Sequence, residues 1–113
     1  MLKHLICNNK CKDEEELKRA VDDISKLVDD NNRIVPVAGD ISQEKVCTSI
    51  IEEPVRRFGR IDILINNAAI GGEPKNVNEL TSNDWDEVVN INLKGAFLCT
   101  REPVKIHVRK TEQ

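Results

Sequence analysis

Polar side chains stand where an α/β protein could bind a ligand. Asn66 and Asn67 directly follow one apolar run, and Asp40 stands near the end of the apolar run before it. In an open α/β sheet, ligands bind outside the carboxyl ends of the strands. These side chains could also belong to ordinary turns, because Asn and Asp favour turn positions. The chain therefore offers amide and carboxylate groups for hydrogen bonding to a ligand, with a turn as the alternative.

Asn92 is the residue most suited to proton chemistry on the pattern of the sequence alone. It lies seven residues after Trp85 and shares a helical face with Val88 and Val89. A polar amide on an apolar stripe must find hydrogen-bond partners or it costs free energy. Two interpretations stay open. The amide either bonds a neighbouring backbone group, or it holds a water or orients a side chain in a site.

Elements that would position these residues alternate between strand and helix. Short apolar runs predict strands at 2–7, 34–38 and 61–65. Apolar residues at helical spacing predict helices at 13–28, 42–58 and from 82 onward. Such alternation predicts an α/β fold with parallel strands joined by right-handed crossovers. The nearly continuous apolar run at 61–65 is typical of a parallel strand covered on both faces.

Helix boundaries are marked by capping residues. Ser42 is a favourable N-cap, and Gly59 is a natural stop for the same helix. The segment from Thr81 to Asp84 resembles a capping box at the start of the last helix. Pro103 is expected to interrupt that helix in its later part.

Composition places the 113-residue chain among globular proteins of at most one domain. The formal net charge is -3 with interspersed signs, which gives no footprint for nucleic-acid binding. No apolar run approaches the roughly 20 residues of a membrane span, and no signal peptide is recognisable. Of the four cysteines only Cys7 and Cys11 are close, so we expect no metal site and free thiols in a cytoplasmic protein.

Five ordered motifs give the chain a resemblance that covers nearly its whole length. The segment 61–69 resembles the Asn-Asn-Ala-Gly signature of the short-chain dehydrogenase/reductase family, close in style to glucose dehydrogenase and 3-oxoacyl-carrier-protein reductase. The remaining matches are Gly39 to Ile41, Phe58 to Asp62, Asp84 with Trp85, and Asn90 to Gly95. The resemblance implies a partial doubly wound, Rossmann-type sheet of three strands and three helices in residues 1–113. It also implies an NAD(P)-dependent oxidoreductase acting on a small carbonyl/alcohol pair.

The resemblance also implies roles for individual residues. Asp40 would accept from the adenine amino group, and the backbone of Ile41 would border the ring. Asn92 would be the active-site Asn that holds a water in the proton relay. The cofactor ribose would be lined by Asn67, Ala68 and Ala69. The intact parent would be a homo-oligomer.

Departures from the family pattern predict that this chain alone is inactive. It has five glycines and no tyrosine, and no trio of glycines fits the family's turn Thr-Gly-x-x-x-Gly-x-Gly. The phosphate cradle is therefore absent. By the resemblance, the catalytic Ser and the Tyr-x-x-x-Lys pair would lie after the point where this sequence stops, so the proton donor is absent too. The central first strand of the sheet is also missing, which predicts either non-native pairing or an open edge. Ala69 replaces the family's Gly.

Cofactor preference and the role of the chain leave alternatives. NAD-binding members of the family usually have an acidic residue at the end of the second strand, and the corresponding residues 7–12 contain none. Lys10 or Lys12 could meet a 2′-phosphate there, which favours NADP over NAD. A solvated basic loop is the other interpretation. The chain could instead be a non-catalytic fragment that docks on a full-length homologue through the helix starting near Ser82. A misread or decayed coding sequence is the third possibility.

Overall fold

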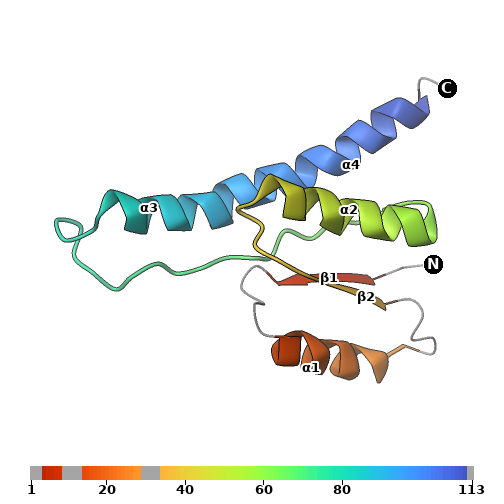
Figure 1. The fold of residues 1–113 in the computed structure, drawn as a ribbon, viewed down its shortest axis with the longest axis horizontal. Coiled ribbons are helices and arrows are strands. Elements are labelled where there is room, and N and C mark those ends of the chain that lie inside the picture. Colours follow the sequence, from red (N-terminus) through yellow and green to blue (C-terminus); the bar gives the residue numbers. More distant parts are fainter. Residues whose placement is uncertain (1–3, 9–13, 29–33, 112–113) are drawn as a thin grey trace.

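The computed structural model describes residues 4–8, 14–28 and 34–111, which form two parallel strands and a set of helices. One helix lies on one face of the strands, and the others lie on the opposite face (Figure 1). The elements in chain order are β1 (His4–Asn8), α1 (Glu14–Ser25), β2 (Ile34–Ala38), α2 (Glu44–Phe58), α3 (Ser82–Val89), η2 (Asn90–Gly95) and α4 (Ala96–Thr111).

β1 and β2 form a two-stranded parallel sheet connected through α1. The register runs from His4 opposite Ile34 to Asn8 opposite Ala38. Parallel strands need a crossover of this kind, because a tight hairpin can join only antiparallel strands. Ile34 and Val35 of β2 are 5% and 3% exposed, so the sheet contributes to the protein interior.

The main hydrophobic core lies between α2 and the long helix formed by η2 and α4. Cys47, Ile50 and Ile51 of α2 are almost completely buried in it. Fully burying an isoleucine contributes about 1.5–3 kcal/mol, so this seam holds the two helices together. The buried members are Ile41, Cys47, Ile50, Ile51, Ile91, Leu98 and Cys99.

The expectation of a third strand is wrong, because residues 61–65 form no ladder in the described part of the chain. Instead, an irregular segment with a single turn at 77–79 runs from 60 to 81 along the helices (Figure 1). A strand forms only beside a partner whose backbone groups it can bond. In the doubly wound order a strand between β1 and 61–65 would supply that partner, and the described residues contain no strand in that place. Of the two expected outcomes, the open edge is the one found, and the described part of the sheet has two strands.

One further expectation about the last helix needs correction. Pro103 does not interrupt it, since α4 runs from Ala96 to Thr111. A proline's φ suits a helix, so the helix continues at the cost of a lost hydrogen bond and of crowding between the ring and the carbonyl four residues earlier. Trp85 is 66% exposed because α3 extends beyond the core, and no residue of α3 is buried. Within the described ranges, no helix combines the length and hydrophobicity needed to cross a membrane.

Capping chemistry was predicted well at two of three helix ends. Gly59 ends α2 with a left-handed φ of 79°, a conformation that glycine adopts without steric cost. Thr81 and Asp84 form the reciprocal capping box of α3. The N-cap of α2 is Gln43 rather than Ser42, whose backbone N–H instead donates to Asp40 Oδ1 at 2.9 Å.

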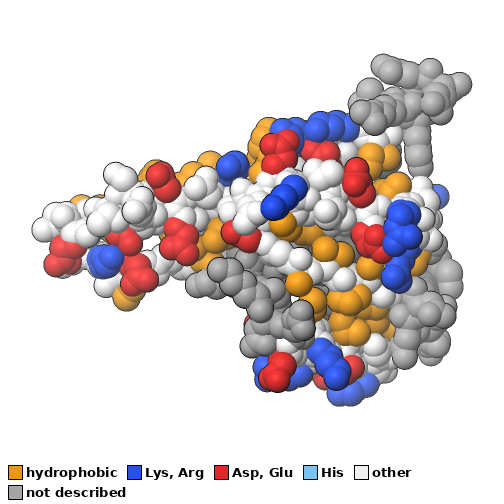
Figure 2. Space-filling model, in the orientation of Figure 1, with side chains coloured by type: hydrophobic (Ala, Val, Ile, Leu, Met, Phe, Trp, Pro, Cys, Tyr) orange, Lys and Arg blue, Asp and Glu red, His pale blue; other side chains and the backbone are white. Residues whose placement is uncertain are grey.

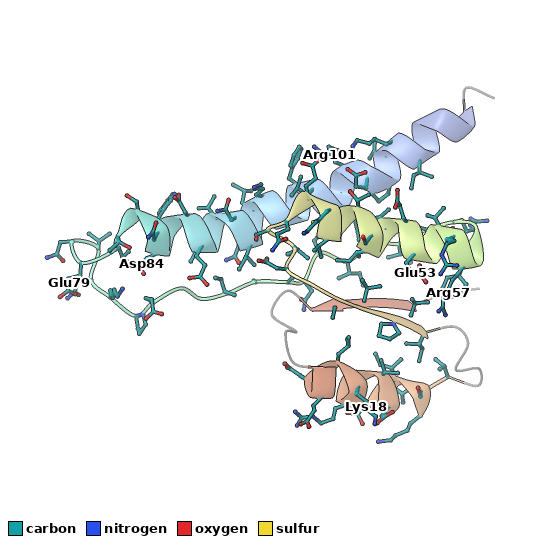
Figure 3. All side chains as sticks on the ribbon, in the orientation of Figure 1. Lys18, Glu53, Arg57, Glu79, Asp84 and Arg101 are labelled. Atoms are coloured by element: carbon teal, nitrogen blue, oxygen red, sulfur yellow. The ribbon has the colours of Figure 1, made fainter. Side chains whose placement is uncertain are left out.

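The capping box sets the pKa of Asp84. Its carboxylate accepts from the backbone N–H and the hydroxyl of Thr81, each at 2.8 Å, and pairs with Lys75 Nζ at 3.1 Å. Figure 3 shows Asp84 at this end of the molecule, far from Arg101 and Arg57. The backbone bond from Thr81, then its hydroxyl and Lys75, lower the pKa of Asp84 from 3.8 to about 2.

We expect this lowered pKa to be measurable and to depend on Thr81. Its contribution to stability is complete above pH 3.8 and is lost as the pH falls towards 2, because the folded pKa lies below the unfolded one. Thr81→Ala removes the hydroxyl and keeps the backbone N–H, so the pKa should rise yet stay below 3.8. An NMR titration of the Asp84 carboxyl measures both values. An unchanged pKa in the variant would contradict the assignment.

Candidate functional site

The side-chain amide of Asn92 holds the backbone of Ile70. Asn92 Nδ2 donates to the Ile70 carbonyl at 2.9 Å, and Asn92 Oδ1 accepts from the Ile70 N–H at 2.8 Å. Both groups are partly buried, and they are 22 positions apart in the sequence. Of the two interpretations left open by the sequence, bonding to a backbone group is confirmed. The two bonds fix the segment 61–70 against the long helix.

Asn92 lies in a wider helical turn. Residues Asn90–Gly95 form the π-helical segment η2, which joins α3 to α4 without a break. Such segments are rare and often occur at functional sites. A Cβ on Gly95 would lie 2.6 Å from Ile41 Cδ1 and 3.2 Å from the Ile41 carbonyl oxygen. η2 therefore contacts two other parts of the chain. Gly95 lies against Ile41, which follows β2, and Asn92 bonds the segment 61–70.

Asp40 and Ile41 form the turn between β2 and α2. Asp40 Oδ1 accepts from the Ser42 N–H, which is the short-range bond expected of an Asp turn. Ile41 is 4% exposed and its side chain belongs to the core. Its carbonyl accepts from Cys47 Sγ at 3.1 Å. The Ile41 side chain is thus occupied by packing, which leaves only its backbone to face a ligand.

Of residues 66–69, which follow the segment 61–65, some contact the rest of the protein and others are exposed to solvent. Asn66 Nδ2 donates to Thr100 Oγ1 on α4 at 3.0 Å. Ala68 packs partly against the core, whereas Asn67 and Ala69 are exposed. The structure brings these residues to the helix that carries Asn92. The side chain of Asn67 is available to a ligand.

Family membership follows from a comparison of the whole chain with known families. The family model described as short chain dehydrogenase matches residues 4–112. The chain belongs to the short-chain dehydrogenase family. The five motifs of the sequence had pointed to this family, and that prediction is confirmed. Its α/β Rossmann-type fold is confirmed as a class, although the strand arrangement is not the expected one.

Individual relatives are dehydrogenases and reductases. Subunit BbsD of a hydroxy(phenyl)methylsuccinyl-CoA dehydrogenase from Thauera aromatica is 35% identical over 89 residues, covering 79% of this chain and 34% of that protein. A short-chain dehydrogenase structure from Bacillus anthracis is 31% identical with a TM-score of 0.81, covering 96% of this chain and 42% of that one.

A third relative was solved with a nicotinamide cofactor. The 3-ketoacyl-(acyl-carrier-protein) reductase from Brucella melitensis in complex with NADH is 31% identical, with a TM-score of 0.73. The match covers 88% of this chain and 37% of that one. Across these three relatives, this short-chain dehydrogenase chain spans between about a third and two fifths of their length.

Polar groups that follow β2 and the segment 61–65 are the ones to compare with the needs of a dinucleotide. Asp40 Oδ1 accepts from the Ser42 N–H, and a carboxylate has about four lone-pair sites in all. Asn67 and Ala69 are open. For the pyrophosphate, the fit fails within the described residues. Their positive-φ glycines, Gly59 and Gly72, follow α2 and lie in the irregular segment rather than at a helix N-terminus. The described residues thus hold exposed polar groups such as Asn67, and they contain no glycine turn at a helix N-terminus for a pyrophosphate.

Cys47 and Cys99 are buried neighbours that sequence reasoning did not place together. Both are free thiols, 0% and 5% exposed, on facing helices. Burial, and then the adjacent Cys99 thiol, raise the pKa of Cys47 to about 12. The thiol is therefore protonated at neutral pH and is no nucleophile. The sequence did contain a signal for the burial of Cys47, because this residue shares the apolar face of its helix with Ile50 and Ile51.

We expect Asn92→Ala to destabilise the chain by about 2–3 kcal/mol, because it leaves the partly buried N–H and C=O of Ile70 without partners. Asn66→Ala is the matched control. It removes one exposed hydrogen bond and should cost about 0.5 kcal/mol. Urea unfolding of both variants measures the free energies of unfolding. Equal losses would contradict the anchoring role of Asn92.

We expect Gly95→Ala to lower the free energy of unfolding, although alanine has the higher helix propensity. The new Cβ would overlap Ile41 and cost about 1–3 kcal/mol, against a gain of about 1 kcal/mol from propensity. Gly71→Ala is the control, because a Cβ there meets nothing within 4 Å. The same urea experiment compares them. A stabilised Gly95→Ala would show that η2 and Ile41 are not in close contact.

Proposed function

We propose that this chain is the adenosine-side part of an NAD(P)-dependent oxidoreductase that acts on a small carbonyl/alcohol pair. The observation that carries the proposal is the pair of hydrogen bonds between Asn92 and Ile70. These bonds place the segment that contains Asn67, Ala68 and Ala69 beside the helix of Asn92. Family membership and the NADH-bound relative support the cofactor class.

Roles in the proposal follow the expected ones. Asp40 accepts from the adenine amino group, and the Ile41 backbone borders the ring. The ribose is lined by Asn67, Ala68 and Ala69. The choice between NADP and NAD stays a prediction, because Lys10 and Lys12 lie outside the described residues.

Asn92 has the capacity for the proposed proton relay while it holds Ile70. A primary amide has two N–H donors and two acceptor lone pairs. Ile70 uses one donor and one lone pair. The remaining donor and lone pair are enough to hold one water. In the proposal Asn92 therefore positions both the segment and the water.

We expect no turnover from this chain alone. The 113 residues contain no tyrosine, so the acid that protonates the carbonyl oxygen is missing from it. NADPH absorbance with a panel of small ketones measures this, with the unsupplemented buffer as the reference. Oxidation of NADPH by the pure chain, abolished in Asn92→Ala, would overturn the prediction.

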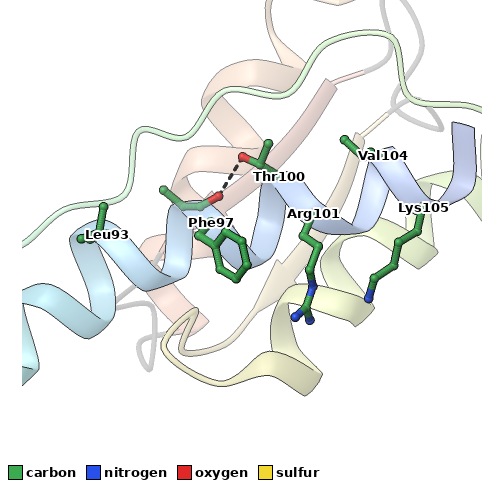
Figure 4. A pocket seen from close by; sticks show the side chains of 7 residues that line it. Leu93, Phe97, Thr100, Arg101, Val104 and Lys105 are labelled. Atoms are coloured by element: carbon green, nitrogen blue, oxygen red, sulfur yellow. Dashed lines mark hydrogen bonds between the residues drawn. The ribbon is translucent and has the colours of Figure 1, made fainter. Parts of the chain in front are cut away.

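A second candidate function is docking on a full-length homologue through the helix that starts near Ser82. The observation that favours it is an apolar groove of about 720 Å³ along η2 and α4, which continue that helix (Figure 4). Leu93, Phe97 and Val104 are 68%, 57% and 56% exposed there. Monomeric proteins rarely leave such stripes open. The same surface would serve the homo-oligomer proposed for the intact parent.

Docking predicts co-purification of the chain with a full-length homologue. Phe97→Asp should weaken that binding at least tenfold, because it places a charge among apolar groove residues. Ser49→Asp is the control, since it adds the same charge at an exposed position of α2. Binding is measured by a titration up to micromolar concentrations. No binding by the unaltered chain, or equal binding by both variants, would contradict this function.

A cytoplasmic location is part of the proposal. The supporting observation is that the two cysteines whose side chains are described, Cys47 and Cys99, are free thiols. Free thiols are typical of reducing compartments.

A further inference from the structure

A cavity of about 290 Å³ lies where α2 ends, between that helix, the start of the irregular segment and α4. All three elements contribute to its apolar wall, which consists of Val55, Ile61, Pro103 and Ile106. Gly59 also lines it, and a Cβ at that position would meet nothing within 4 Å, so the space beside the helix end is open. None of the residues proposed for the cofactor lines this cavity.

Two oppositely charged side chains line the same cavity. Arg60 Nε donates to Asp62 Oδ1 at 2.6 Å, and the two side chains are 73% and 43% exposed. A guanidinium has five N–H donors, and both contacts of Arg60 with Asp62 use this one oxygen. Among the described residues, no hydrogen bond reaches Asp62 Oδ2. Each member of the pair therefore has hydrogen-bonding capacity left for a third group.

The charges around the cavity favour neither a simple anion nor a simple cation. On the face in Figure 2, basic and acidic side chains lie together at the right, where α2 ends. Glu53 accepts there from Arg56 and Arg57, so these charges are already paired (Figure 3). The pair of Arg60 and Asp62 is exposed, and exposed ion pairs contribute little to stability because water screens them. Its members can therefore turn to a ligand at small cost.

The groups around the cavity fit the three parts of a free amino acid. A guanidinium binds a carboxylate through two parallel hydrogen bonds. The carboxylate of Asp62 can accept from an ammonium group, and the C-terminal end of α2 favours a positive charge as well. The apolar wall has room for one side chain, whereas drug-sized ligands occupy pockets of about 300–1,000 Å³.

We propose that this cavity binds a free α-amino acid with an apolar side chain. The carboxylate of the amino acid bonds Arg60, and its ammonium group bonds Asp62. Its side chain packs against Ile61, Pro103 and Ile106, which line the cavity. A zwitterion brings one charge of each sign and so matches the ion pair that it contacts. This site does not depend on the proposed cofactor or on turnover, and its test is independent of theirs.

An NMR titration of the full chain tests the class of ligand. We expect L-phenylalanine to bind saturably and one-to-one, with the largest shifts at the backbone amides of Gly59, Arg60 and Asp62. Three probes each lack one part: 3-phenylpropionate the ammonium group, phenethylamine the carboxylate, and glycine the side chain. Each should bind at least tenfold more weakly. No saturable binding of L-phenylalanine, equal binding of any of the three probes, or shifts centred elsewhere would overturn the proposal.

Two variants of the chain assign the charged contacts. Arg60→Gln should abolish the preference for L-phenylalanine over phenethylamine, and Asp62→Asn should abolish the preference over 3-phenylpropionate. Arg56→Gln is the control, because it removes the same charge from α2 at a residue outside the cavity lining, and it should bind like the unaltered chain. Far-UV circular dichroism shows whether the variants stay folded, and the probe series on the unaltered chain decides the question without them. Folded variants that keep both preferences, or an equal loss in Arg56→Gln, would contradict the assignment.

Discussion

The bonds between the Asn92 amide and the Ile70 backbone are the interaction on which the arrangement depends. In a complete parallel sheet, a buried strand is fixed by ladders on both sides. Residues 61–65 have no such ladder in the described chain. Two side-chain hydrogen bonds at 2.8 and 2.9 Å, with the packing of Ile61 and Leu64, replace it. Without these two bonds the segment would be held against the helix only weakly, because the partly buried backbone groups of Ile70 would lack partners.

The same constraint links the sheet to the helices. η2 meets Ile41 through the close approach of Gly95, and it meets the segment 61–70 through Asn92. Behind it, α4 packs on α2 around Cys47 and Cys99, whose burial keeps the Cys47 thiol protonated. The core and the segments that carry Ile41 and Ile70 therefore pack against one continuous helix. A change in η2 is expected to disturb both.

Sequence patterns predicted what depends on near neighbours. The apolar run at Ile34–Ala38 and the capping box at Thr81 formed as expected. The apolar run at 61–65 could not show whether it pairs, since a strand needs a partner that is distant in the chain. The exposure of Trp85 has the same origin, because periodicity shows a face but not what covers it. The unusual position of Asn92 on an apolar helical face was visible in the sequence. The π-helical turn of η2 has no local sequence signal that we recognise.

The most direct measurement is an NMR search for nuclear Overhauser effects between the Asn92 side-chain amide protons and the backbone protons of Ile70 and Gly71. The structure predicts these effects, together with no cross-strand effects from residues 61–65, since the amide groups are in hydrogen-bond contact and the segment has no ladder. Absence of the Asn92 effects, or cross-strand effects between 61–65 and β1, would contradict the account. In that case the segment would be held by backbone pairing rather than by Asn92.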